Sequence, residues 1–428
     1  MKKFVIILLV ACLALGCGIG YFAAKNGAEP SPAPVAETAA PAAGTTETAP
    51  AEESVDALAA PPAEENTEET AAEEPVEESP IRTLDLAAIR ALHAPDEIVG
   101  DVDGREVSWD EYCYWIAEMG TQAQNYIYTM AMYGQSLDWD DKLSADSEQT
   151  FAEYTLELAQ DCVRQLATLE AVAKEYDVTL TAEDEAALAA QLRSDIDATC
   201  GEDASEEDFN AYLAENDLSR EMYDRMNRAN YLFDGIFRTI YGANGETVTE
   251  EDALAYLEEN EYLSAAHILF RTVDDSYNPL DEAAVAEKLE QAEAVSAELR
   301  AIEDPEARAA RFAELKEQYC EDPGRVDYPD GYVFVPGMMV EEFENTVKSL
   351  ADYEVSEPVL SVHGYHVIMR LPLNADATVS ISDDGTHLSA RRLYANDRFN
   401  ELIGSRIEAS VLTLNDDVAA LKLADYLG

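Results

Sequence analysis

The chain has 428 residues and carries 88 acidic against 28 basic side chains, a formal net charge of −60 at pH 7. This length exceeds one comfortable hydrophobic core, so two or more domains are expected. The excess of negative charge repels phosphates and anionic lipid headgroups, which argues against nucleic-acid binding and against docking on a membrane through a charged surface patch.

Residues 1–25 are typical of a membrane-targeting segment. Lys2 and Lys3 precede an uncharged apolar run over residues 4–24, and Lys25 follows it. About twenty apolar residues can span a bilayer, and the lysine pair would keep the N-terminus cytoplasmic. The rest of the chain is therefore expected on the extracytoplasmic side of the cell membrane.

Two kinds of anchor remain open for this segment: an uncleaved signal-anchor helix, or a cleaved lipoprotein with a lipid-modified cysteine. Cys12 and Cys17 each follow residues that resemble a lipoprotein cleavage box. Cleavage at Cys12 would leave an apolar stub at the mature N-terminus, so the lipidation site would be Cys17. A fully secreted product is the third alternative.

Residues 26–81 predict a disordered, acidic linker. They consist almost wholly of Ala, Pro, Glu, Thr and Ser, and neither Lys nor Arg occurs between Lys25 and Arg82. Such a segment has too little apolar surface to offset the entropy of ordering, and its like charges extend it. It would hold a folded body away from the membrane.

The sequence then predicts a mostly α-helical domain over residues 82–260. Residues 99–107 alternate in polarity around an Asp-Gly turn, as a hairpin does, and Ser108 can cap a helix over residues 109–133. Further helix starts are predicted where Ser or Thr precedes an acidic first turn, namely at Ser147, Thr181, Ser205, Ser219 and Thr249.

Residues 261–374 predict an α+β domain with an antiparallel sheet. The expected elements are a strand over 262–270, helices over 281–301 and 304–319, a strand over 332–335, a helix over 341–350, and strands over 359–361 and 366–371. Residues 375–428 return to helix, over 388–410 and 415–427, and could pack back on the helical domain.

The remaining cysteines show neither a metal-ligand nor a CxxC spacing. They do not form a disulfide framework, although one bridge stays open; buried free thiols are the plainer prediction. His363 and His366 stand three residues apart on a predicted strand and would point to opposite faces. No metal site and no cofactor are therefore expected.

Two of the five histidines lie in apolar, strand-like runs, Ala-Ala-His267-Ile-Leu and Gly-Tyr-His366-Val-Ile. Between them stand Tyr-Cys-Glu-Asp322-Pro, then Phe334-Val-Pro-Gly-Met-Met-Val-Glu-Glu-Phe343-Glu, then Val-Ser-Glu-Pro-Val before Gly-Tyr-His. In this order the motifs resemble those of the parvulin-type peptidyl-prolyl cis-trans isomerases. The resemblance covers residues 262–374 and implies the parvulin fold, an antiparallel sheet with flanking helices.

The resemblance implies a catalytic group of His267, Asp322, Ser361 and His366. The two histidines would face each other across the sheet, Asp322 would lie next to the substrate carbonyl, and Ser361 would supply a hydroxyl on the strand before His366. For each histidine taken alone, a buried imidazole satisfied by a neighbour is the plainer interpretation.

The resemblance also implies a proline pocket formed by Met339 and Phe343, with Phe334 as a further wall. Met339 and Phe343 occupy positions i and i+4, so one helical start presents both on one face. Ordinary core packing explains such a pair too, and both interpretations stay open.

The chain departs from the parvulin pattern at two places. His363 stands where an aromatic residue or Ser is commoner, and residues 327–332 lack the family's Gly-Asp-Leu-Gly run. An apolar pocket residue is therefore missing or replaced by Tyr332. Nor does an Arg or Lys cluster follow the His267 strand to hold a phosphate, so an ordinary X-Pro bond is the expected substrate.

The function expected from the sequence is an extracytoplasmic, membrane-tethered prolyl isomerase that assists the folding of exported proteins. Its partners would be unfolded or partly folded exported proteins with X-Pro bonds. The helical domain weakly resembles the chaperone segment of exported foldases, and its aromatic and Met residues suit either client binding or a core. The alternatives are a holdase chaperone with a silent parvulin domain, and an inert structural spacer.

Overall fold

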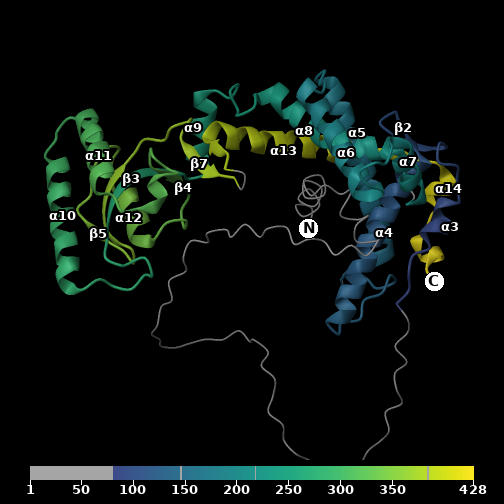
Figure 1. The fold of residues 1–428 in the computed structure, drawn as a ribbon, viewed down its shortest axis with the longest axis horizontal. Helices are drawn as coiled ribbons and strands as arrows, with labels where there is room; N and C mark the ends of the chain where they lie inside the picture. Colours follow the sequence, from purple (N-terminus) through teal and green to yellow (C-terminus); the bar gives the residue numbers. More distant parts are fainter. Residues whose placement is uncertain (1–80, 145–146, 217, 383–384) are drawn as a thin grey trace, which may run out of the picture. The chain divides into compact units, whose positions relative to one another are not determined.

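The computed structural model describes residues 81–144, 147–216, 218–382 and 385–428 (Figure 1). The expected anchor, Cys17, and the linker up to residue 80 lie outside these residues. The described chain falls into two compact units, one formed by residues 81–163 with Leu412–Gly428 and the other by Arg164–Val411.

The secondary structure is mixed α+β, as the sequence predicted. Its elements up to residue 260 are α3 (Leu86–Arg90), β1 (Ile98–Val102), β2 (Arg105–Ser108), α4 (Trp109–Met132), α5 (Phe151–Glu175), α6 (Ala182–Cys200), α7 (Glu206–Glu215), α8 (Arg220–Tyr241) and α9 (Glu250–Glu259). Those that follow are β3 (Leu263–Arg271), α10 (Glu282–Arg300), α11 (Pro305–Tyr319), η1 (Pro323–Arg325), β4 (Tyr332–Phe334), α12 (Glu341–Ser349), β5 (Val359–Leu360), β6 (Gly364–Arg370), β7 (Thr378–Ile381), β8 (His387–Ser389), α13 (Ala390–Ala409), β9 (Leu412–Leu414), α14 (Asp416–Ala419) and η2 (Leu423–Tyr426).

The helix starts follow side-chain capping. Four predicted N-caps are confirmed, because each side chain accepts a hydrogen bond from a backbone amide of the first turn: Thr181, Ser205, Ser219 and Thr249. The start predicted at Ser147 is wrong. Helix α5 begins at Phe151, and Thr150 accepts from the Glu153 amide while the Glu153 carboxylate accepts from the Thr150 amide. This reciprocal pair is a capping box and fixes the later start.

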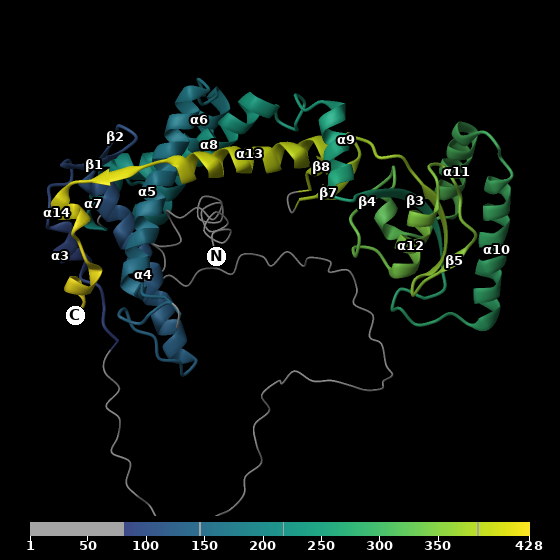
Figure 2. The same cartoon turned by 180° about the vertical axis from the view of Figure 1, so that it is seen from behind.

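The predicted hairpin is formed by β1 and β2, and Ser108 caps α4 as expected. The helix predicted over 415–427 is not formed as such, because α14 ends at Ala419. Strand β9 pairs with β1 on the edge opposite β2, and Figure 2 shows it there. Thr83 and Gly428 exchange both backbone hydrogen bonds, at 2.8 and 3.0 Å. Strand pairing at both ends of this segment leaves room for short helical turns only.

Helix α13 begins at Ala390, two residues later than predicted, after the short strand β8. Its Phe399 ring contacts Phe233 and Phe237 of α8, with centroids 4.7 and 5.4 Å apart. Its Asp397 accepts a hydrogen bond of 2.7 Å from the Tyr256 hydroxyl of α9. This C-terminal helix therefore packs on α8 and α9, which lie before the α+β region and more than a hundred residues earlier in the chain.

The α+β region contains a four-stranded antiparallel sheet in the order β4-β3-β6-β5. Helices α10 and α11 cover one face of the sheet and α12 covers the other (Figure 1). Beneath α12 lies a small apolar cluster of Ala265, Phe334, Phe343, Val347 and Ile368. The element order βααβαββ predicted from the sequence is confirmed, with strand and helix bounds within about three residues.

Candidate active site

Both histidines of the sheet point to the face that α12 covers. His267 pairs with Ile368 and His366 pairs with Leu269 across the β3–β6 ladder. Cross-strand partners project to the same face, and Leu269 lies two residues after His267, so the two imidazoles share that face. They are 7% and 3% exposed, and their rings stack with centroids 5.0 Å apart.

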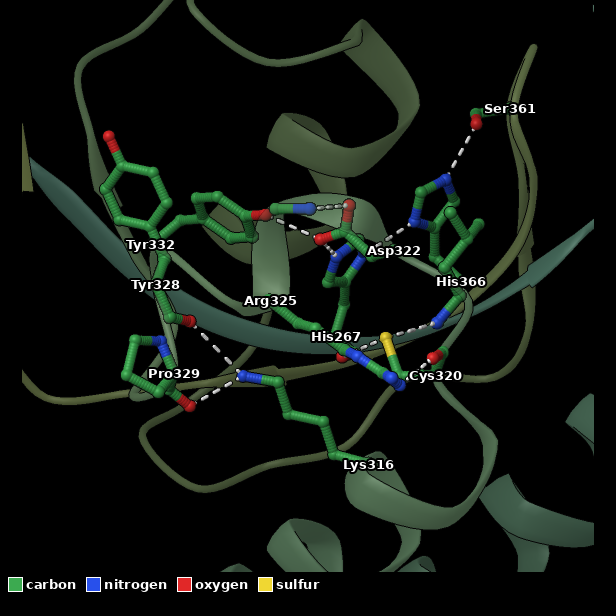
Figure 3. Close-up of polar contacts among 12 residues, drawn as sticks. His267, Lys316, Cys320, Asp322, Arg325, Tyr328, Pro329, Tyr332, Ser361 and His366 are labelled. Carbon is green, nitrogen blue, oxygen red and sulfur yellow. Dashed lines mark hydrogen bonds and ion pairs between the residues drawn. The ribbon is translucent and has the colours of Figure 1, made fainter. Parts of the chain in front are cut away.

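A continuous hydrogen-bonded chain runs through these rings (Figure 3). The Nδ1 atoms of His267 and His366 lie 2.8 Å apart. His267 Nε2 lies 2.8 Å from Asp322 Oδ2, and His366 Nε2 lies 2.7 Å from Ser361 Oγ. The structure thus brings together all four residues that the resemblance implied as a catalytic group.

The donor and acceptor of each hydrogen bond in this series follow from its two ends, Asp322 and Ser361. A carboxylate only accepts, so His267 Nε2 carries a proton and donates to Asp322. If His267 is neutral, its Nδ1 accepts from His366 Nδ1, and Ser361 donates to His366 Nε2; if His267 is cationic, both inner bonds reverse. In either arrangement His366 is neutral, and all four ring nitrogens of the two histidines have a hydrogen-bond partner.

The electrostatics favour that neutral His366. Burial lowers the pKa of His366 from 6.5 to about 3, and the charges of His267 and His363 act in the same direction, with Asp322 partly opposing them. A neutral, buried imidazole cannot serve as a cationic donor at ordinary pH. In both arrangements His366 links His267 to Ser361 by hydrogen bonds without carrying a charge.

Asp322 is held as a carboxylate. Its burial raises the pKa, but the hydrogen bond and charge of His267, the Tyr332 hydroxyl and the Gly324 amide together bring the pKa well below its usual range. Opposing donors thus outweigh desolvation, and the site carries a fixed negative charge next to the histidine pair.

Of the three expected pocket residues, Phe343 lies against the same histidines. The Phe343 ring meets His267 and His366 edge-on, with centroids 5.3 and 5.7 Å apart. Phe334 is fully buried and lies 5.9 Å from Phe343, whereas Met339 is only partly buried at the border of this cluster. The arrangement joins an apolar wall to the polar chain, and Phe334 supports Phe343 from the core.

Sequence reasoning missed two polar contributors. Tyr332 was expected at most as an apolar replacement, yet its hydroxyl donates to Asp322 Oδ2 at 2.5 Å. The Lys316 ammonium donates to the carbonyl oxygens of Pro329 at 2.7 Å and Tyr328 at 3.4 Å, the turn before Tyr332. The alternation of Tyr332 with Phe334 along one strand would have placed that ring on the histidine face.

Other reactive groups of the described chain are not arranged for metal or disulfide chemistry. Over the residues that the structure covers, no group of three His, Cys, Asp or Glu side chains could hold a metal ion. Cys200 and Cys320 are free thiols, and Cys113, Cys162 and Cys320 are buried.

This combination of fold and site defines a parvulin-type peptidyl-prolyl isomerase domain. A sequence model of the family described as "Rotamase: PPIC-type PPIASE domain" matches residues 267–371. These residues are a PPIase domain of the EC 5.2.1.8 class. The match covers all four strands of the sheet except the first residues of β3.

Known relatives belong to the SurA and PrsA proteins. The chain is 36% identical over 101 residues to the chaperone SurA of Vibrio vulnificus, which is 23% of either chain. It is 48% identical over 58 residues to the foldase protein PrsA 4 of Bacillus cereus, 13% of this chain and 21% of that one. The chain thus spans about a quarter of the length of the curated relatives it matches.

The solved structures that resemble the chain include PrsA from Bacillus subtilis. That match has 17% sequence identity, covers 65% of this chain and 97% of the other, and has a TM-score of 0.26. A superposition this loose supports no conclusion about the site.

Proposed function

We propose that the chain catalyses cis-trans isomerisation of X-Pro bonds in unfolded or partly folded exported proteins. The observation that carries this proposal is the chain from Ser361 through both histidines to Asp322, placed against the Phe343 wall on one face of the parvulin sheet. Met339 would receive the proline ring together with Phe343.

The reaction requires rotation about a peptide bond, whose barrier is roughly 18–20 kcal/mol because the C–N bond is partly double. In the planar amide, resonance places negative charge on the carbonyl oxygen, and twisting withdraws it. A fixed carboxylate at Asp322 beside that oxygen repels the planar state more than the twisted one. This difference lowers the barrier without any bond being broken.

The histidines have supporting roles in this mechanism. His267 donates to Asp322 and so fixes the carboxylate, while His366 and Ser361 fix the ring of His267. Because His366 is neutral and 3% exposed, it neither attacks the substrate nor exchanges protons with it. The pocket excludes water from the twisting amide, which strengthens the carboxylate's effect.

Substrate residues before proline are expected to be uncharged or basic. Arg271, which ends the His267 strand, donates to the Asp275 carboxylate and to the Asp274 carbonyl, both at 2.8 Å. Its guanidinium is therefore engaged by its own loop. A phosphorylated residue would meet the negative charge of Asp322, and Arg271 is not free to compensate it, so ordinary X-Pro bonds fit better.

The helical region, residues 82–260, is proposed to bind clients. In α4 the first turns are buried at Tyr112 and Trp115, whereas its last turns expose several large apolar side chains: Tyr126, Tyr128, Met132 and Tyr133. Exposed Met and aromatic groups adapt to many unfolded segments. This observation also favours a second candidate function, a holdase whose isomerase domain is silent.

The location is proposed to be the extracytoplasmic face of the cell membrane, with residues 1–25 as the anchor and 26–81 as the tether. The charged N-terminal pair and the apolar run support it. Over the residues that the structure covers, no helix is long and apolar enough to cross a bilayer. Fractionation of cells before and after Cys17→Ser would separate a lipid anchor from a helical one.

The isomerase proposal is tested by exchange of an X-Pro peptide, measured by NMR with the full chain and with residues 82–428. Asp322→Ala should lower kcat/KM at least about tenfold, as loss of one preorganised electrostatic group does. Met339→Ala should lower it too, because it removes apolar surface that would bind the proline ring. Asp327→Ala and Met338→Ala are matched controls, since both side chains are exposed neighbours. Absence of catalysis by the intact chain, together with suppressed aggregation of an unfolded client, would establish the holdase instead.

A further inference from the structure

The Asp322 carboxylate receives a donor that the parvulin resemblance does not provide. Its Oδ2 atom accepts from His267 Nε2 at 2.8 Å and from the Tyr332 hydroxyl at 2.5 Å. Its Oδ1 atom accepts from the Gly324 amide at 3.0 Å. Both oxygens are therefore held, and the carboxylate plane is fixed from three directions (Figure 3).

The Tyr332 ring is placed by its strand and by a pinned turn. Tyr332 pairs with Ala265, two residues before His267, and its ring lies 5.7 Å from that imidazole. The Tyr328 ring packs on it at 5.0 Å. Lys316 holds the carbonyl oxygens of the turn that leads into the strand. The hydroxyl therefore reaches Asp322 from a constrained ring.

Gly324 leaves the space that this hydroxyl occupies. A Cβ atom at Gly324 would lie 2.3 Å from the Tyr332 hydroxyl oxygen but 3.4 Å from the ring carbon that bears it. Its backbone needs no positive φ, so the glycine is not required by the turn itself. Glycine is required here because any side chain would clash with the Tyr332 hydroxyl oxygen, so the two residues depend on each other.

We propose that Tyr332 is a positioning residue of the isomerase site, whose hydroxyl, admitted by Gly324, fixes the orientation of the Asp322 carboxylate toward His267. This inference rests on the proposed isomerase function. It replaces the expectation of an apolar pocket residue at this position. Tyr332 acts through Asp322 and need not touch the substrate.

The ionisation of Asp322 is coupled to this contact. The groups that face the carboxylate are His267 on β3, Tyr332 on β4, His366 on β6 and Lys316 on α11, with Cys320 in its own segment. A donor to the charged form favours that form. Removing the Tyr332 hydroxyl therefore raises the pKa of Asp322, while the other groups stay in place.

The decisive experiment compares Tyr332→Phe, Gly324→Ala and the double variant in the full chain, with X-Pro exchange as the readout. Tyr332→Phe should lower kcat/KM about tenfold, as expected for loss of one hydrogen bond to a charged group, and move the acid limb of the pH profile to higher pH. Gly324→Ala should reproduce both effects. In the Tyr332→Phe background Gly324→Ala should be nearly neutral, because the clashing oxygen is gone.

The matched control is Tyr365→Phe, a tyrosine on the opposite face of the same sheet. It should change neither the rate nor the pH profile. Additive effects of Gly324→Ala and Tyr332→Phe, or a Tyr332→Phe profile that superimposes on the unaltered chain, would overturn the inference. If the unaltered chain shows no catalysis, the proposed function fails separately. In that case ¹³C NMR decides the inference: a raised pKa of Asp322 in Tyr332→Phe supports it, and an unchanged pKa contradicts it.

Discussion

The depressed pKa of His366 predicts a stability of the isomerase domain that falls as the solution becomes acidic. The imidazole titrates at 6.5 in the unfolded chain and at about 3 in the folded one. Between these values the unfolded state binds one proton more than the folded state. The free energy of unfolding therefore decreases as the pH falls through this window, and is unaffected by His366 above it.

The size of the effect follows from the linkage. One full proton of difference corresponds to about 1.36 kcal/mol for each pH unit. Because the unfolded imidazole is only half protonated at pH 6.5, lowering the pH from about 6.5 to 4.5 should cost ~2 kcal/mol. Asp322 adds to the loss only below its unfolded value of 3.8, because its folded pKa is lower still. Protonation of other carboxylates relieves the net charge of −60 and works in the opposite direction. A comparison with a variant is therefore required.

The assay is hydrogen exchange of the β3 and β6 amides, followed by mass spectrometry at several pH values. All three tryptophans precede the domain, so their fluorescence would not report on it. His366→Asn should lower the slope of unfolding free energy against pH by the contribution of about one proton. His387→Asn, at an exposed histidine of β8, should leave that slope unchanged. Equal slopes in His366→Asn and in the unaltered chain would refute the assignment of a neutral His366.

Three further predictions concern stability. Phe343→Ala should lower the free energy of unfolding of the domain by about 3–5 kcal/mol, whereas Met338→Ala, at a 62% exposed side chain, should change it by less than about 0.5 kcal/mol in urea titrations. Tyr223→Phe removes a 2.5 Å donor from Asp195, which is 2% exposed, and should destabilise the α6–α8 packing by about 1.5–3 kcal/mol, measured by circular dichroism. Thr181→Ala removes the capping box of α6 and should cost about 1 kcal/mol, seen as faster amide exchange in its first turn.

Much of the fold could be predicted because its signals are local. Apolar, strand-like runs marked the strands that carry His267 and His366, and Ser or Thr before an acidic turn marked most helix starts. The start predicted at Ser147 was wrong because Thr150 and Glu153, a few residues further on, form a capping box that fixes the start of α5 at Phe151.

The C-terminal pairing could not be predicted in the same way. Residues 412–414 form a strand because β1 offers an unpaired edge some three hundred residues earlier in the chain. Gly100 permits the approach, since a Cβ atom there would lie 2.3 Å from the Thr413 carbonyl oxygen. Long-range pairing of this kind leaves no period in the short segment itself, so residues 412–414 were not predicted as a strand.

In the candidate site, the sequence predicted which residues take part but not how their side chains are oriented. The types and order of His267, Asp322, Ser361 and His366 were evident from the motifs, but the direction of each side chain depends on strand register. For this reason the sequence suggested Tyr332 only as a replacement for an apolar pocket residue. That its hydroxyl contacts Asp322 depends on the space left by Gly324 and on the turn that Lys316 binds. Only coordinates reveal such a contact.

The register that aligns the two histidines is itself fixed by a glycine. Gly364 pairs with Arg271 at the end of the β3–β6 ladder and has a φ of +142°. A Cβ atom there would lie 2.2 Å from the Phe270 carbonyl oxygen, so a larger residue would force the strands apart. A slip of one residue would turn His366 to the opposite face of the sheet, away from His267 and Phe343. The glycine of Gly-Tyr-His thus serves the site through the pairing of the strands, two residues before the imidazole it positions.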